Sequence, residues 1–292
     1  MTSNWPSPSV ADGLGPGSAQ ATPPLVQMEA ICKFYGSVEA LRGVDLELGE
    51  HEILGLVGDN AAGKSTLVKI LAGAERPTSG RVRIRGAPVH FRNPAEGRLA
   101  GIETVHQTLA LCENLNAVAN VSLGREARRG GILGRLGFVD MAAMEELTLH
   151  SLHQFDSTLR PGLYRPTEML SGGQKQTVAI VRAAAFKAQV VIMDEPTANL
   201  GAANSSRVLD MMRMLRDAGA ALILITHRFN DVFAVTDRIE VLRTGMVAGI
   251  RRTSETSAEE LLWLMTMGEV GGDERAGATA QTGPLPLRSE AV

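Results

Sequence analysis

A strand, a glycine-containing loop and a helix follow one another at residues 52–73, and this unit constrains the fold more than any other stretch. The apolar run EILGLV at 52–57 is typical of a buried strand. The loop GDNAAGKST at 58–66 matches the pattern G-x-x-x-x-G-K-[ST]. The segment STLVKILAG then has the character of a helix that ends at Gly73. A strand that enters a helix through such a loop predicts an α/β domain.

The loop itself predicts a phosphate-binding site. Small residues let backbone N–H groups point at phosphate oxygens, and the helix N-terminus adds partial positive charge. Lys64 would supply a full charge to the β- and γ-phosphates, and the Ser65 hydroxyl can bind Mg²⁺. The alternative is a strand-to-helix turn without ligand, which the Lys-Ser-Thr sequence disfavours. The expected nucleotide-binding residues of this loop are Gly58, Asp59, Asn60, Ala61, Ala62, Gly63, Lys64, Ser65 and Thr66.

Two adjacent acids end a second apolar run, VVIMDEPT at 190–197. At the end of a buried strand Asp194 is expected to hold Mg²⁺, directly or through water, and Glu195 to orient or deprotonate an attacking water. Adjacent carboxylates at such a place are costly unless cations or donors meet them. The alternative, a solvated acidic turn, fits poorly with a phosphate loop in the same chain.

The remaining pattern predicts strands and helices around this site. Strands are expected at 26–35, 81–86 and 221–226, with a turn at Gly49-Glu50 before the strand that enters the loop. Continuous apolar runs indicate strands covered on both faces, as in a parallel sheet. Helices are expected at the following ranges: 116–123, 140–155 with Asp140 as N-cap, 172–187, 203–217 and 229–235.

Composition and charge limit the classes of protein to which this chain can belong. The net charge of −3 gives no general argument for nucleic-acid binding. No apolar run approaches the roughly 18–20 residues that span a bilayer. Residues 1–24 and 269–292 lack hydrophobic periodicity and are predicted to be disordered tails, and the first lacks the features of a secretory signal. We therefore expect a soluble cytoplasmic chain whose role at a membrane would depend on a partner.

Four short motifs identify a family resemblance. Asp194 follows Lys64 by 130 positions, a much longer gap than in a small GTPase, and the guanine-reading motif N-K-x-D of such proteins is absent. Both observations argue against a small GTPase. The motifs are LSGGQ at 170–174, DEPT at 194–197, Gln107 in VHQ and His227 in ITHR. In this order they resemble the ATP-binding subunits of ABC transporters over about residues 26–268. The resemblance implies an α/β P-loop NTPase core with a mainly parallel sheet, an antiparallel β subdomain and an inserted helical subdomain at about 108–180, within one domain at 25–268.

The LSGGQ motif is expected to act on a second subunit. The helix predicted from about Gly173 to Lys187 is roughly 22 Å long at about 1.5 Å per residue. It leads back toward the Asp194 strand, which leaves LSGGQ at its far end, too distant to serve its own phosphate loop. A helix N-terminus with a hydroxyl and two glycines suits an anion. The resemblance implies head-to-tail dimers in which Ser171, Gly172, Gly173 and Gln174 contact the partner's ATP.

The resemblance also assigns single positions. Tyr35 matches the aromatic that stacks on adenine; a core aromatic is the alternative, and Phe34 competes for the role. Gln107 matches the residue that senses Mg²⁺ and couples to membrane subunits. His227 matches the histidine that hydrogen-bonds the γ-phosphate, in either protonation state. The implied catalytic residues are Lys64, Glu195 and His227, and the implied Mg²⁺ ligands are Ser65, Gln107 and Asp194.

Longer stretches resemble the monosaccharide-importer branch of that family, in its single-cassette form. They are HQTLALCENLNAVANVSLGRE, FVDMAAM, EPTANLG and EELLWLMTMG. The implied partners are a second ATP-binding subunit, in a homodimer, integral membrane permease subunits and, indirectly, an external sugar-binding protein, with no nucleic acid. The chain would then lie on the cytoplasmic face of the membrane. The alternatives are a soluble ABC-type ATPase acting on ribosomes or nucleic acid, and an importer for another solute.

Three positions depart from the family pattern. Ala61 stands where glycine is usual, and its Cβ is compatible with the loop only if φ is negative. Gly201 stands where most members have Asp, and Asn199 is unusual. The basic stretch REARRGG at 125–131 is interpreted as a solvated loop rather than a nucleic-acid site. None of the three departures from the family pattern removes a catalytic group, so we expect an active ATPase.

Overall fold

The computed structural model describes residues 23–155, 159 and 162–268. The tails predicted at 1–24 and 269–292 therefore lie outside the described residues, apart from residues 23 and 24.

A six-stranded sheet forms the centre of the molecule, in the order β10-β9-β3-β8-β7-β6. Five of these strands run parallel, and only the edge strand β10 pairs antiparallel, with β9. The mainly parallel sheet predicted from the apolar runs is thereby confirmed. Its strands are β3 (Ile53–Gly58), β6 (Ile102–Val105), β7 (Val190–Asp194), β8 (Ala221–Ile225), β9 (Arg238–Arg243) and β10 (Met246–Arg252).

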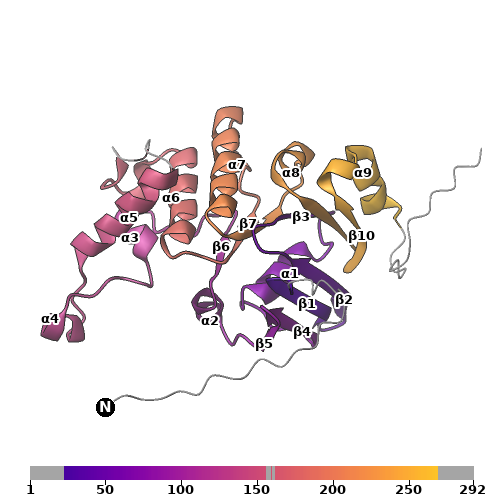
Figure 1. Ribbon diagram of the computed structural model, residues 1–292, viewed down its shortest axis with the longest axis horizontal. Coiled ribbons are helices and arrows are strands. Elements are labelled where there is room, and N and C mark those ends of the chain that lie inside the picture. Colours follow the sequence, from indigo (N-terminus) through magenta and orange to yellow (C-terminus); the bar gives the residue numbers. More distant parts are fainter. Residues whose placement is uncertain (1–22, 156–158, 160–161, 269–292) are drawn as a thin grey trace, which may run out of the picture.

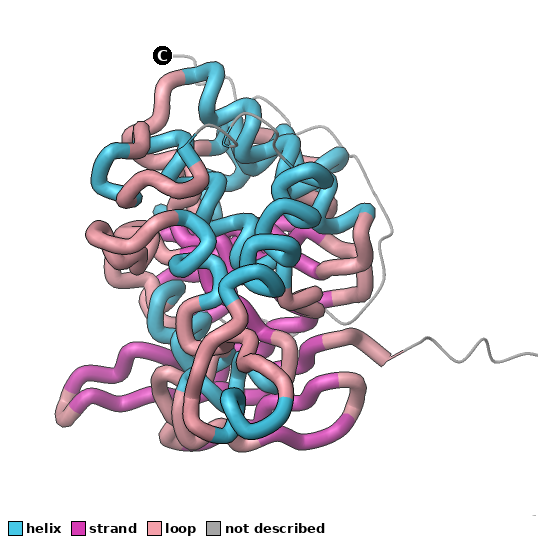
Figure 2. Tube along the Cα trace, turned by 90° about the vertical axis from the view of Figure 1, so that its left-hand side faces the viewer, coloured by secondary structure: helices cyan, strands magenta, loops and turns pink. Residues whose placement is uncertain are grey.

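A second sheet of four antiparallel strands, in the order β2-β1-β4-β5, lies below the first in Figure 2. Its strands are β1 (Val26–Tyr35), β2 (Val38–Leu48), β4 (Ser79–Ile84) and β5 (Ala87–Val89). The turn predicted at Gly49-Glu50 does follow β2, but it carries the chain from one sheet into the other because β2 and β3 do not pair.

Helices cover the central sheet and form a separate group at one side, around α6 in Figure 1. Within that group α3, α5 and α6 pack on one another, and Asp140 caps α5 by accepting from Ala143 N at 3.1 Å. Five helices follow the sequence prediction closely: α3 (Ala117–Ser122), α5 (Met141–Phe155), α6 (Gly172–Ala185), α7 (Ala202–Asp217) and α8 (Phe229–Val235). The others are α1 (Lys64–Leu71), α2 (Pro94–Leu99), α4 (Gly131–Arg135) and α9 (Ala258–Thr266), with 3₁₀ turns η2 (Thr167–Met169) and η3 (Thr253–Glu255).

None of the helices in the described part of the chain is long and apolar enough to cross a membrane.

Helix α1 and the two sheets enclose one of the hydrophobic cores. Leu54 and Leu56 of β3, Leu46 of β2 and Leu67 of α1 are fully or almost fully buried within it. Because burial of such side chains stabilises a fold by roughly 1.5–3 kcal/mol each, this core fixes the phosphate loop at the junction of the two sheets.

One carboxylate interrupts this apolar packing. Glu240 of β9 is fully buried beside Leu56, and neither of its oxygens has a hydrogen-bond partner among the residues that the structure describes. Burial raises the pKa of Glu240 to about 8, against the lowering effect of Arg238. The nearby acids Asp45, Glu47 and Glu52 raise the pKa further. The folded chain therefore holds Glu240 protonated near neutral pH, while the unfolded chain ionises it.

Glu240→Gln should stabilise the protein in a pH-dependent manner. Between pH 4.5 and about 8 the folded state binds one proton more than the unfolded state at this position. The free energy of unfolding of the wild type should therefore fall, relative to the variant, by about 1.4 kcal/mol per pH unit. Urea unfolding of both proteins at pH 5, 6.5 and 8 measures the difference. A difference that stays constant over this range would contradict the burial of an ionisable carboxyl.

Candidate functional site

Four parallel strands end beside one cavity of about 800 Å³. The carboxyl ends of parallel strands lie at one edge of a sheet, and loops that follow them form binding sites there. Here β3 leads into the phosphate loop, β6 into Gln107, β7 into Asp194 and Glu195, and β8 into His227. The cavity is lined by Val38–Ala40, Gly58–Thr66, Gln107, Asp194, Glu195, Ile225, His227 and Met265.

The phosphate loop surrounds the ammonium group of its own lysine. Lys64 Nζ donates to the carbonyl oxygens of Gly58 at 2.7 Å and Asp59 at 2.9 Å. Gly58 cannot be replaced without strain, because a Cβ there would lie 2.2 Å from Leu242 O and its φ is +153°. Burial lowers the pKa of Lys64, while the carboxylates of Glu195, Asp59 and Asp194 oppose that shift. The lysine is thus a partly desolvated cation, held where a phosphate would replace the carbonyl contacts.

The adjacent acids occupy different surroundings. Burial raises the pKa of Asp194, and the charge of Glu195 raises it further. Glu195 Oε1 lies 2.9 Å from Nδ1 of His227, and its Oε2 accepts from Thr226 Oγ1 at 3.4 Å. The backbone of Glu195 has φ +51°, a left-handed conformation that costs a non-glycine residue of the order of 1–3 kcal/mol. The two side-chain hydrogen bonds fix the direction of this carboxylate, and the surrounding structure holds the strained backbone that carries it.

Oxygen donors gather where the sequence predicts Mg²⁺. The Ser65 hydroxyl, the Gln107 amide and the Asp194 carboxylate line the same cavity, and hard oxygen ligands of this kind suit Mg²⁺. In the described part of the chain no group of three or more His, Cys, Asp or Glu side chains forms a metal site. A cation bound here would take further ligands from nucleotide phosphates, as Mg²⁺ commonly does.

Ser171, Gly173 and Gln174 of the LSGGQ motif line a different pocket, of about 180 Å³, at the start of α6. Ser171 caps the helix through a reciprocal pair in which Gln174 N donates to Ser171 Oγ at 3.3 Å and Ser171 N donates to Gln174 Oε1 at 3.0 Å. Gly173 faces Asn204 of α7 so closely that a Cβ would lie 2.9 Å from its side chain. No residue lines both this pocket and the phosphate-loop cavity. The structure thus separates the two motifs within one chain, as the sequence analysis expected.

Tyr35 lies at the end of β1, is 43% exposed and has Lys33 Nζ 5.0 Å from its ring centre. It is not among the residues that line the phosphate-loop cavity, although Val38–Ala40 are. Its contact with adenine therefore stays a prediction. Val38–Ala40 and Met265 of α9 also line the cavity and were not predicted from the sequence. Val38–Ala40 follow Tyr35 closely, but nothing in the sequence around Met265 indicates a nucleotide pocket.

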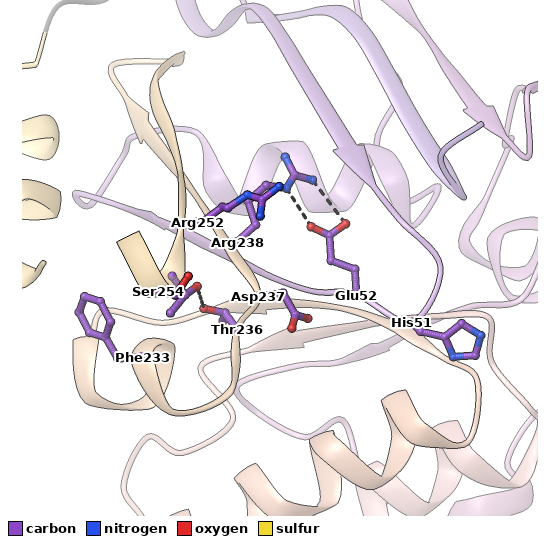
Figure 3. Close-up of a pocket in the computed structure, with 9 residues that line it drawn as sticks. His51, Glu52, Phe233, Thr236, Asp237, Arg238, Arg252 and Ser254 are labelled. Atoms are coloured by element: carbon purple, nitrogen blue, oxygen red, sulfur yellow. Dashed lines mark hydrogen bonds and ion pairs between the residues drawn. The ribbon is translucent and has the colours of Figure 1, made fainter. Parts of the chain in front are cut away.

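A further concavity, of about 690 Å³, lies at the opposite, amino-terminal edge of β3 and β9 (Figure 3). Most of its polar groups are already engaged: Arg238 pairs with Glu52 at 2.8 Å, and Asp237 accepts from Ile53 N at 2.8 Å. It shares no lining residue with the phosphate-loop cavity. This concavity is therefore not part of the candidate nucleotide site.

Ala61 does not meet the condition set by the sequence analysis, because its φ is +66° rather than negative. This left-handed backbone conformation costs a residue with a Cβ roughly 1–2 kcal/mol. Asn199, also unusual by sequence, has φ +61°, and asparagine tolerates that conformation well. Gly201 is the N-cap of α7 with open space around its Cα.

Ala61→Gly should raise the free energy of unfolding by about 0.5–1 kcal/mol, because relief of the strain exceeds the entropy that glycine adds to the unfolded chain. Ala62→Gly is the matched control. Ala62 is buried and has no positive φ, so its replacement should lower stability. Thermal unfolding of the two variants measures both effects, and a loss of stability in each would disprove strain at Ala61.

Comparison with protein families gives a match to the ABC transporter model over residues 41–198. The fructose import ATP-binding protein FrcA of Rhizobium meliloti is 45% identical over 226 residues, which cover 77% of this chain and 87% of that protein. The xylose/arabinose import ATP-binding protein XylG of Sulfolobus acidocaldarius is 36% identical, over 85% of this chain and 96% of that protein.

A solved structure of similar fold is a dimeric ATP-binding cassette in a post-hydrolysis state, bound to ADP and Pi. It superimposes with a TM-score of 0.66 at 26% identity and covers 78% of this chain and 98% of its own. The fold, the family match and the two close relatives agree. The chain therefore belongs to the ABC transporter family, as an ATP-binding cassette that hydrolyses ATP to drive transport.

Proposed function

We propose that this cassette energises the import of a monosaccharide through separate membrane subunits. The observation that carries the proposal is the convergence of Lys64, Asp194, Glu195 and His227 on one cavity, in a chain 45% identical to a fructose import ATP-binding protein. The cavity supports ATP hydrolysis, and the relatives supply the class of cargo. The sugar itself would never contact this chain.

In the proposed mechanism the phosphates of ATP take the place of the carbonyl oxygens that Lys64 now contacts. Ser65, Gln107 and Asp194 would hold Mg²⁺, which neutralises charge on the phosphate oxygens. Glu195 orients the attacking water and accepts its proton. His227 hydrogen-bonds this carboxylate, and its other ring nitrogen would be available to bind the γ-phosphate. Each role rests on a side chain that lines the cavity.

The separation of the two pockets supports a head-to-tail dimer. The N-terminus of α6, with Ser171 and Gly173, lines a pocket that shares no residue with the phosphate-loop cavity of its own chain. In the proposed homodimer it would cover ATP held by the partner, so that two ATP molecules lie between the subunits. Hydrolysis then weakens the interface, because it removes contacts to the γ-phosphate and adds repulsion.

A groove of about 360 Å³ supports a docking site for the permease. It lies between β6 and the helical group, and Val121, Arg125 and Arg182 are among its lining residues. His106 also lines it and adjoins Gln107 of the nucleotide cavity. A permease segment in this groove would therefore follow movements at the γ-phosphate. Through this contact the chain would lie at the cytoplasmic face of the membrane.

Uptake of a panel of labelled monosaccharides tests the proposal, in cells that lack this chain and carry either wild type or Glu195→Gln. Uptake of one sugar should return with wild type only, because the amide keeps the shape of the carboxylate but cannot accept a proton. If no sugar responds while purified protein hydrolyses ATP, the cargo assignment is wrong. Binding to ribosomes or nucleic acid would then favour a soluble ATPase, and uptake of another solute a different importer.

Mixed dimers test the shared site. Lys64→Ala disables the phosphate loop, and Gly173→Ala brings a Cβ against Asn204 at the LSGGQ pocket. Each variant alone should lose most ATPase activity. In a mixed dimer one site combines the intact phosphate loop of one chain with the intact LSGGQ of the other, so mixing the two should restore activity. Addition of wild type to each variant serves as the control, and mixtures as inactive as their components would argue for a site within one chain.

A further inference from the structure

The residues between α3 and α5, which include the stretch expected from sequence to be a solvated loop, are largely exposed and form a projecting hairpin. Residues 127–140, here called the arginine hairpin, pair through Arg129 N to Phe138 O at 3.0 Å and Asp140 N to Ala127 O at 2.7 Å. Helix α4 forms its tip. Gly134 packs so closely that a Cβ would lie only 1.8 Å from Arg129 O. The hairpin thus has a defined shape that depends on glycine at the tip.

The tip presents apolar side chains to solvent. Ile132 is 75% exposed, Leu136 68% and Phe138 55%. Leu133 and Val139 are also exposed. Single exposed apolar residues are ordinary, but several on one small projection mark an interaction site. In Figure 1 α4 lies at the far end of the molecule from α9, beyond the rest of the helical group.

The same hairpin concentrates positive charge. Arg128, Arg129 and Arg135 are exposed, and none has an ion-pair partner among the residues that the structure describes. The nearby acid Glu126 accepts from Gly124 N at 2.9 Å. This local excess of cations stands out in a chain whose net charge is −3. A long-range attraction to this hairpin therefore requires an anionic surface.

We propose that the arginine hairpin docks on the anionic surface of a lipid bilayer. Its apolar tip would enter the headgroup region while the three arginines contact lipid phosphates, a combination that suits membrane interfaces. An acidic protein surface would satisfy the arginines but would need a matching apolar pocket. A bilayer has no fixed shape to match, so it can take up an apolar tip of any shape. For this reason we favour a lipid surface over an acidic protein surface.

The position of the hairpin agrees with such a contact. Leu123, Gly124 and Arg125, which lead into it, line the rim of the groove proposed for permease docking. If that groove faces a membrane subunit, the hairpin extends from the docked face toward the surrounding lipid. This orientation rests on the proposed function, whereas binding to lipid vesicles does not, so the two can fail separately.

Flotation of the purified full chain with vesicles tests the proposal. The vesicles contain either phosphatidylcholine alone or a mixture of phosphatidylcholine with the anionic lipid phosphatidylglycerol, whose negative surface potential attracts basic segments. We expect binding to the anionic vesicles only, weakened by salt. The variant Arg128→Gln, Arg129→Gln, Arg135→Gln should bind about 100-fold more weakly. The variant Ile132→Ser, Leu136→Ser, Phe138→Ser should also lose most of its binding.

Matched controls separate this surface from general charge and hydrophobicity. Arg76→Gln, Arg81→Gln, Arg92→Gln removes three exposed arginines elsewhere, and Met214→Ser, Ile250→Ser, Leu262→Ser removes three exposed apolar side chains. Both should bind like wild type, and all four variants should keep basal ATPase activity. Equal loss in the controls, or no binding of wild type to anionic vesicles, would overturn the proposal. Recruitment only by vesicles that contain the permease would identify a protein as the occupant instead.

Discussion

The site depends on the electrostatic attraction between Lys64 and the carboxylates of Asp194 and Glu195 at the end of a buried sheet. Burial disfavours the charged forms of both Lys64 and Asp194. Each is kept near the other because the core beneath them holds β3 and β7 in register, through β8. The loop satisfies the lysine with its own carbonyl oxygens. Those contacts are the ones that a polyphosphate can replace, so the strained and desolvated state of the loop favours binding of an anion.

The sequence predicted those strands and helices whose hydrophobic pattern and capping residues match their position in the folded chain. The apolar runs of β7 and β8 are buried strands, and the helices from 140 to 155 and from 172 onward begin at their caps, Asp140 and Ser171. The phosphate loop, both acids and His227 were also found from their motifs, because their chemistry requires particular residues in sequence order. Their convergence on one cavity follows from the single edge at which parallel strands end.

Other features could not be predicted because they depend on packing between distant segments. The positive φ of Ala61 is set by the closure of the loop, and local sequence favours the opposite sign. Met265 reaches the cavity only because α9 packs on the central sheet. Glu240 lies in a strand that also carries an arginine at each end, so local sequence does not mark it as buried; its burial is decided by the packing of β2 and β3 around it. Pairing across the arginine hairpin likewise joins residues that carry no hairpin signal.

The two faces of the cassette are joined by a very short segment. Val105 is the last residue of β6, His106 lines the groove, and Gln107 lines the nucleotide cavity. Burial lowers the pKa of His106 against the opposing charge of Asp194, which places the imidazole within electrostatic reach of the proposed Mg²⁺ ligand. The amino-terminal end of this segment is held by the sheet, because Val105 pairs with Met193 of β7. Under the proposed function, a change in contacts at the γ-phosphate would need to pass through only two residues to reach the groove.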